Sequence, residues 1–189
     1  MAEVVEINLV CKEVLKYDIL LEFINKNIDN CYGVETIKAM DNWGDDTSIE
    51  IDSKEILDCL FNNKIICITE KTNSGFAGID IERIESVINY TVWFNQEKYD
   101  ILSEYYNLIN NFLLFIKQEI KNKFVLCAIG KEVVFDFQND YTRLFKTCHN
   151  IDIWINMDIE LTDTILQKYE KFTVDNYTVL KKRNIDIIL

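Results

Sequence analysis

The side chains best suited to nucleophilic or metal chemistry are six cysteines and one histidine, namely Cys11, Cys31, Cys59, Cys67, Cys127, Cys148 and His149. A structural zinc site usually takes two ligands from one tight turn, as Cys-x2–4-Cys. The closest cysteines, Cys59 and Cys67, have seven residues between them, so we expect no metal site and scattered, reduced core thiols. Adjacent residues point in different directions, which makes Cys148 a poor catalytic partner for His149. A dyad of the histidine with a thiol distant in sequence stays open.

Motifs for phosphate binding and hydrolysis are absent from the sequence. The five glycines fit neither G-x-G-x-x-G nor G-x-x-x-x-G-K-[ST], and there is no G-x-S-x-G or H-E-x-x-H. Asp80 and Glu82 lie two residues apart on an expected strand, so they project from one face and could hold Mg²⁺ or Mn²⁺ with a third acid. The solvated face of an antiparallel strand has the same alternation, and we prefer that interpretation. The sequence therefore predicts no catalytic residue, no metal site and no cofactor.

The densest acidic stretch is residues 41–58, which we call the acidic segment. It contains a tryptophan in a turn-like loop, and it fails the template of a calcium-binding loop. Many protein interfaces consist of a large aromatic anchor with a charged rim, and an acidic rim suits a basic partner. We therefore expect a partner-binding surface made by Asp41, Trp43, Asp45, Asp46, Glu50 and Asp52. The alternative, which is the commoner arrangement, is that Trp43 fills the core while the carboxylates solvate the loop.

The charge of the whole chain narrows the class of partner. With 32 acidic and 20 basic side chains the net charge is -12, and residues 1–63 alone hold 14 acidic and 5 basic side chains. Direct binding to nucleic acid or to an anionic membrane is therefore not expected, since affinity for phosphates needs cations. Glu3 and Glu6 stand where a secretory signal would have basic residues, and no apolar run approaches the roughly 18 residues of a membrane span. We expect a cytoplasmic protein.

Three helices are expected to position these residues. Apolar residues from Val10 to Ile28 recur every three or four positions, which predicts an amphipathic helix over residues 11–29, followed by a loop through residues 30–47. A short helix begins near Asp52, which caps it together with Glu55, and buries Ile56, Leu57, Leu60 and Phe61. The longest pattern indicates a helix over residues 96–121 that lies across the sheet as the main wall of the core or, alternatively, forms a dimer.

The remaining patterns predict a mainly antiparallel sheet. Strands are expected at residues 48–51, 64–71, 76–83, 86–94, 124–129, 133–137, 151–157 and 185–189, and a further helix near residues 162–171. The chain has no proline, few glycines and no linker-like stretch, so we expect one compact domain over residues 1–189. The predicted fold is α+β, with the sheet packed against one long helix (about 96–121) and the N-terminal amphipathic helix.

In composition alone, this small, acidic α+β domain resembles many bacterial immunity proteins, which neutralise cationic toxin domains, often nucleases. The resemblance implies a non-enzymatic protein that covers a basic protein partner, which an anionic surface would attract. A first alternative is a metal-dependent or thiol enzyme whose site is assembled from distant residues such as Asp80, Glu82 or His149. A second is a structural or regulatory subunit that uses the helix at residues 96–121 in an oligomer. The sequence leaves the oligomeric state open.

Overall fold

The structure is a computed structural model that describes residues 4–27, 33–44, 46–73, 75–95, 99, 102–121, 123–131, 151–156, 167–174, 177–183 and 185. Its strands are β1 (Val4–Cys11), β2 (Val34–Met40), β3 (Ile49–Glu50), β4 (Ile65–Thr72), β5 (Gly75–Ile84), β6 (Val87–Asn95), β7 (Phe124–Lys131), β8 (Ile151–Asn156), β9 (Tyr169–Val174) and β10 (Tyr177–Lys182). Its helices are α1 (Tyr17–Asn27), the 3₁₀ turn η1 (Ser53–Glu55), α2 (Ile56–Phe61), α3 (Leu102–Phe115) and the π-helical segment η3 (Ile116–Ile120).

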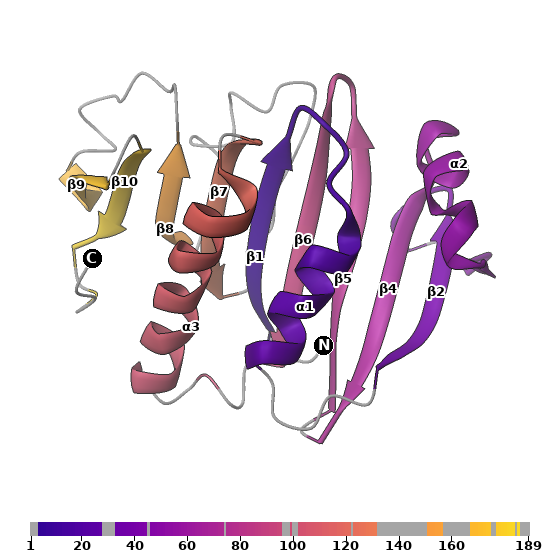
Figure 1. The fold of residues 1–189 in the computed structure, drawn as a ribbon, viewed down its shortest axis with the longest axis horizontal. Helices are drawn as coiled ribbons and strands as arrows, with labels where there is room; N and C mark the ends of the chain where they lie inside the picture. The colour runs from indigo at the N-terminus through magenta and orange to yellow at the C-terminus, as the bar shows by residue number, and fades with distance from the viewer. Residues whose placement is uncertain are drawn as a thin grey trace.

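The described strands form one ten-stranded antiparallel sheet in the order β3-β2-β4-β5-β6-β1-β7-β8-β10-β9. Helices α1, α2 and α3 lie over the same face of it (Figure 1). This confirms the predicted α+β class with a mainly antiparallel sheet. The pairing of β4 with β5 and of β5 with β6 also confirms the predicted meander. Period-two alternation and the turn before Gly75 mark these strands in the sequence. Among the described residues, no helix has the length and apolar composition of a membrane span.

Strand β1 occupies the middle of the sheet, between β6 and β7, although the sequence analysis assigned no strand there. Val5, Ile7 and Leu9 point into the core and are fully buried. The second half of β1 is buried on both faces, so its apolar run is nearly continuous and lacks the alternation of a half-exposed strand. The predicted helix over residues 11–29 was therefore wrong at its start: Cys11 ends β1, and α1 begins only at Tyr17.

The expected long helix over residues 96–121 is also wrong in length. The α-helix α3 begins at Leu102 and has fourteen residues, and η3 adds five more before Lys121. The apolar spacing begins before the helix itself, because Tyr99 in the connection that precedes α3 also packs on the core. The centroid of its ring lies 5.8 Å from that of Phe94. Residues 96–98, 100 and 101 lie outside the described residues.

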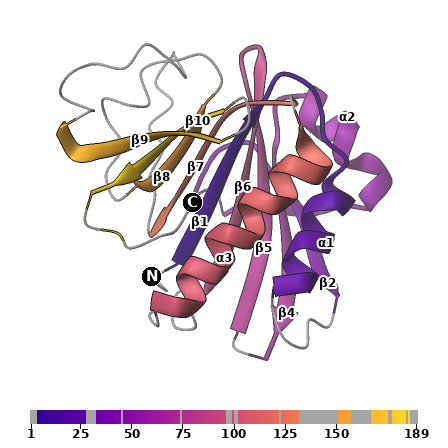
Figure 2. The same cartoon turned by 60° about the vertical axis from the view of Figure 1, so that its left-hand side comes forward.

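Helix α3 nevertheless covers the sheet as the sequence analysis expected. Tyr105, Leu108, Ile109 and Phe112 of α3 are buried, as their three- and four-residue spacing requires. Phe112 meets Phe23 of α1 with ring centroids 5.1 Å apart, so the two helices share an aromatic cluster above the sheet. Figure 2 shows both helices side by side on that face.

Several elements at the ends of the sheet differ from the sequence analysis. Residues 34–40, expected in a loop, form β2, and the strand β10 was not predicted. The helix expected near residues 162–171 is wrong at its end, because Tyr169 begins β9, whose partner β10 supplies hydrogen bonds that no local pattern reveals. The strand expected at residues 133–137 lies outside the described residues.

Candidate functional site

The acidic segment (residues 41–58) forms one edge of the sheet and wraps around it. Its central strand β3 stands at one end of the strand order, and among the described strands it pairs with β2 alone, through Lys38 opposite Glu50 and Ala39 opposite Ile49. Before β3 the loop carries Trp43, and after β3 the chain turns into η1 and α2 on the helix-covered face. The segment therefore presents its side chains on both sides of the edge.

The predicted carboxylates of this surface are exposed where the structure describes them. Asp41, Asp46, Glu50 and Asp52 are all exposed, and Asp45 lies outside the described residues. Two of them have basic neighbours: Lys64 Nζ lies 2.9 Å from Asp41 Oδ1, and Lys54 Nζ lies 3.1 Å from Asp52 Oδ2. Such exposed pairs contribute little to stability. The segment has a strong negative charge, because it contains seven acidic residues and one basic residue.

The capping of η1, which continues into α2, explains how the segment turns at the edge. Asp52 and Glu55 form the predicted capping box, in which Glu55 Oε2 accepts a hydrogen bond from the Asp52 N–H at 2.8 Å. The box satisfies backbone donors that the start of a helix would leave unpaired. It thereby fixes the direction of η1 and α2 after β3.

Trp43 lies on the surface and does not fill the core. Its side chain is 54% exposed, and its indole Nε1–H donates a hydrogen bond of 3.2 Å to Oε2 of Glu82 on β5. The interpretation of Trp43 as a core plug is therefore wrong. Because side chains alternate along a strand and Ile81 faces the helices, Glu82 points to the opposite sheet face. The indole of Trp43 consequently lies against that opposite face, and its N–H is held there by Glu82.

The neighbouring carboxylate, Asp80, is paired in the same way on the same face. Trp93 Nε1–H and the Cys67 thiol donate hydrogen bonds to it. The indole of Trp93 lies directly over Gly78, where an added Cβ would come within 2.5 Å of Trp93 Cζ2, so only glycine leaves room for this arrangement. The interpretation of Asp80 as part of a solvated strand face is therefore wrong.

Burial sets the electrostatics of these two carboxylates. Burial, with a smaller contribution from the charge of Glu82, raises the pKa of Asp80 to about 6, although the hydrogen bonds from Cys67 and Trp93 act to lower it. Burial also raises the pKa of Glu82, against the hydrogen bond from Trp43. Their oxygens are engaged by indole and thiol donors, and the described residues contain no group of three potential metal ligands.

The cysteines that the structure describes are free thiols, and two of the four are buried. Cys11 and Cys127 are buried, whereas Cys59 and Cys67 are partly exposed. Desolvation raises the pKa of Cys11 to about 12 and that of Cys127 well above its usual value, which makes thiolate chemistry unfavourable at both. Cys31, Cys148 and His149 lie outside the described residues.

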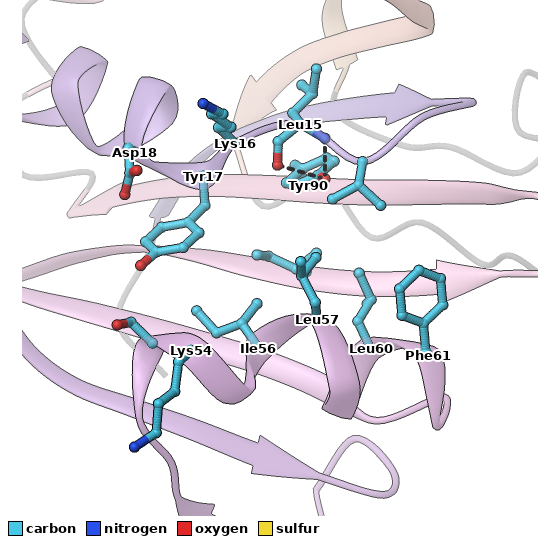
Figure 3. Close-up of a pocket in the computed structure, with 13 residues that line it drawn as sticks. Leu15, Lys16, Tyr17, Asp18, Lys54, Ile56, Leu57, Leu60, Phe61 and Tyr90 are labelled. Carbon is cyan, nitrogen blue, oxygen red and sulfur yellow. Dashed lines mark hydrogen bonds between the residues drawn. The ribbon is translucent and has the colours of Figure 1, made fainter.

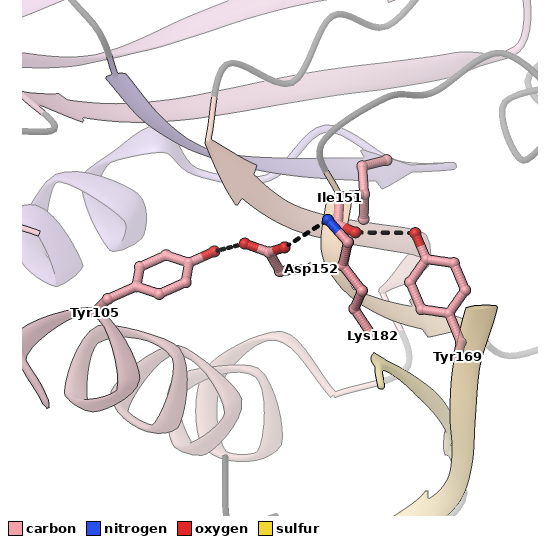
Figure 4. Close-up of polar contacts among 5 residues, drawn as sticks. All are labelled: Tyr105, Ile151, Asp152, Tyr169 and Lys182. Atoms are coloured by element: carbon pink, nitrogen blue, oxygen red, sulfur yellow. Dashed lines mark hydrogen bonds and ion pairs between the residues drawn. The ribbon is translucent and has the colours of Figure 1, made fainter. Parts of the chain in front are cut away.

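A separate polar cluster joins α3 to the strands at the β9 end of the sheet. Asp152 of β8 accepts a hydrogen bond of 2.7 Å from the Tyr105 hydroxyl, and Lys182 Nζ lies 3.4 Å from its other oxygen (Figure 4). The Tyr169 hydroxyl donates to the backbone oxygen of Ile151 at 2.9 Å. The cluster connects α3, β8, β9 and β10, and its donors and acceptors satisfy one another, which is typical of a structural contact.

A groove on the helix-covered face was not predicted from the sequence. It has a volume of about 580 Å³, lies between residues 14–18 and residues 53–61, and is also lined by Ile81 and Tyr90 (Figure 3). The Tyr90 hydroxyl accepts a hydrogen bond of 2.8 Å from the Leu15 N–H and donates one of 3.3 Å to Leu15 O. The backbone before α1 is thereby held at the edge of the groove.

Two residues expected in the core lie instead at the mouth of this groove. Leu57 is 49% exposed and Phe61 is 60% exposed, whereas Ile56 and Leu60 are buried as expected. The sequence contained a signal for this: α2 has only six residues and is apolar on nearly every side. So short a helix can press only one side against a sheet, which leaves the other apolar side at the surface.

Comparisons with known proteins identify no relative of this chain. Neither a known protein family nor a curated protein matches its sequence. Among solved structures, a chain in the crystal structure of the toxic C-terminal tip of CdiA from Pseudomonas aeruginosa in complex with immune protein is similar, with a TM-score of 0.43 and 11% identity. The similarity covers 70% of this chain and 88% of that chain. A likeness at this TM-score is too distant to establish a common fold or to assign a role to any residue.

Proposed function

We propose that this protein is a binding module for a positively charged protein and that the acidic segment is its contact surface. The form of this function that the charge suits best is an immunity or inhibitor protein that covers a cationic toxin domain such as a nuclease. The observation that carries the proposal is the half-exposed indole of Trp43 among exposed carboxylates at a sheet edge.

The hydrogen bond to Glu82 suits Trp43 to the role of an anchor. An aromatic side chain that is already oriented loses less conformational entropy on binding than a freely rotating one. Because Glu82 satisfies the indole N–H, a partner can cover the ring without leaving a buried donor unpaired. Tryptophan is among the residues that most often dominate binding energy at protein interfaces.

The carboxylates suit a steering role. Among the described residues, Asp46 and Glu50 have no ion-pair partner, so their charges are available to a cationic surface. Charges at the rim of an interface mainly accelerate association and exclude partners of like charge. An anionic cover would also compete with nucleic-acid phosphates for the basic site of a nuclease.

The test is to isolate the bound protein from the native host and then measure the kinetics of the purified pair. Trp43→Ala should raise koff by about 30-fold or more, which corresponds to a hot spot of about 2 kcal/mol. The double variant Asp46→Lys, Glu50→Lys should mainly lower kon. The control is Glu119→Lys, which reverses an exposed charge on η3, outside the acidic segment.

Two results would contradict the proposal. One is a partner whose kinetics respond to the control as strongly as to the double variant. The other is a partner whose binding ignores both Trp43 and the charge reversals, even if it is an authentic toxin. The enzyme and the oligomer subunit remain the alternative hypotheses, and no observation among the described residues favours either.

A further inference from the structure

The groove on the helix-covered face leaves apolar side chains in contact with water. Three of its lining residues, Val14, Leu57 and Phe61, are large, apolar and exposed. Its lining also includes buried apolar residues, among them Leu60 and Ile81. A mainly apolar hollow of about 580 Å³ has the size of a small-molecule site, and an apolar ligand would remove this surface from water.

The charges around the groove are mainly positive. Lys16, Lys54 and Asp18 line it, and Arg83 lies beside it, next to Phe61. These four charged residues are three cations and one acid, whereas residues 1–63 as a whole contain 14 acidic and 5 basic side chains. The groove is therefore a cationic place in an anionic part of the molecule, and its charge suits an anionic ligand.

Arg83 is the cation best placed to bind the charged end of such a ligand. Its guanidinium lies over the Phe61 ring, 5.7 Å from the ring centroid, and has no acidic partner among the described residues. Figure 3 shows Phe61 at one end of the groove and Asp18, the one acid of its described lining, at the other end beside Tyr17. A guanidinium at the edge of an apolar surface can bind a carboxylate through two parallel hydrogen bonds.

We propose that the groove binds a dissolved long-chain carboxylate of the fatty-acid type. Its alkyl chain lies in the groove and covers Val14, Leu57 and Phe61, and its carboxylate binds to Arg83. The opposite orientation would place the carboxylate beside Asp18, where like charges repel. The inference does not rest on the proposed function, because the anchor of that surface, Trp43, lies against the opposite face of the sheet.

The test uses the full chain with dansyl-labelled undecanoate, a probe whose fluorescence rises when it moves from water into an apolar site. Unlabelled laurate, kept below the concentration at which it forms micelles, should displace the probe. Hexanoate, which is six methylenes shorter, should be at least about 100-fold weaker. Dodecyltrimethylammonium has a chain of the same length and the opposite charge, and it should be at least about tenfold weaker than laurate.

Variants separate the charged end of the groove from its apolar lining. Arg83→Gln should weaken laurate at least about tenfold and leave dodecyltrimethylammonium unaffected, while Arg83→Lys keeps part of the affinity for laurate. The matched control is Lys16→Gln, at a lining cation that the proposal does not use. The double variant Leu57→Gln, Phe61→Gln should weaken both ligands, and its control is Leu114→Gln, at an exposed leucine on α3. Melting curves check that each variant stays folded.

Four results would overturn the proposal. If hexanoate displaces the probe as well as laurate does, the alkyl chain does not occupy the groove. If the double variant at Leu57 and Phe61 binds laurate normally, the ligand lies elsewhere. If Lys16→Gln weakens laurate and Arg83→Gln does not, the carboxylate is at the wrong end. If the protein sediments with phosphatidylglycerol vesicles but does not bind dissolved laurate, the groove contacts a membrane and not a free carboxylate.

Discussion

At the scale of single residues, two carboxylates of β5 are each paired with a tryptophan. Trp43 donates to Glu82, and Trp93 donates to Asp80, so each indole both uses its polar edge and shields a carboxylate. Shielding a carboxylate from water costs free energy when it is charged. Asp80 is the more affected of the two, and its pKa of about 6 makes stability depend on pH.

Asp80→Asn should flatten this pH dependence. Above the usual pKa of a carboxyl the unfolded chain loses the Asp80 proton, while the folded protein keeps it until about pH 6. The folded state therefore binds more protons in this window, and the free energy of unfolding falls as pH rises from about 4 to 6. Between pH 4.5 and 7 the wild type should lose roughly 2 kcal/mol more stability than Asp80→Asn, by urea denaturation. Asp46→Asn, at an exposed carboxylate, is the control that keeps the wild-type slope; the same slope in Asp80→Asn would contradict the prediction.

At the scale of elements, aromatic contacts hold α3 against α1 and the sheet. Substitutions on the buried and on the exposed side of the helix should therefore change stability by different amounts. Phe112 is fully buried and contacts Phe23 and Phe115 with ring centroids 5.1 Å and 5.8 Å away. Phe112→Ala should lower the free energy of unfolding by about 3–5 kcal/mol, because it leaves a cavity between α1, α3 and the sheet. Leu114→Ala, two residues on and 54% exposed, should stay within about 0.5 kcal/mol of the wild type. Thermal or urea unfolding measures both; equal effects would mean that α3 packs differently.

At the scale of the whole molecule, the asymmetric charge should govern the encounter with a partner. The chain has a net charge of -12, and the acidic segment accounts for half of it. Added salt screens such charges over a Debye length of about 8 Å at physiological ionic strength, which is shorter than the range over which steering acts. With the partner identified, raising the salt concentration should lower kon by at least about tenfold and change koff little.

Trp43→Ala separates steering from anchoring in the same stopped-flow measurement. The variant should keep the salt dependence of kon, since no charge is removed, while its koff is faster at every salt concentration. A salt effect confined to koff, or kinetics independent of salt, would rule out the steering role of the acidic segment.

The sequence by itself determined the features that depend on neighbours along the chain. Alternation between Ile79 or Ile81 and the acids beside them marks β5, and the Asp52–Glu55 spacing marks the start of η1, which continues into α2, because both patterns need only a few consecutive residues. The α+β class of the fold likewise follows from the order of such patterns along the chain. These parts of the prediction are confirmed.

Only the tertiary structure decided the features that depend on contacts between distant residues. Glu82 lies 39 positions from Trp43 and holds it at the surface, and no local pattern specifies that pair. Strand β1 lies in the middle of the sheet because it pairs with both β6 and β7. Its second half is buried on both faces, so its sequence lacks the alternation of apolar and polar residues that would have predicted a strand. Leu57 and Phe61 are exposed because α2 can turn only one side to the sheet, which makes a groove with residues 14–18. Apolar spacing shows that a side chain can be buried, but the position of the next element determines whether it is.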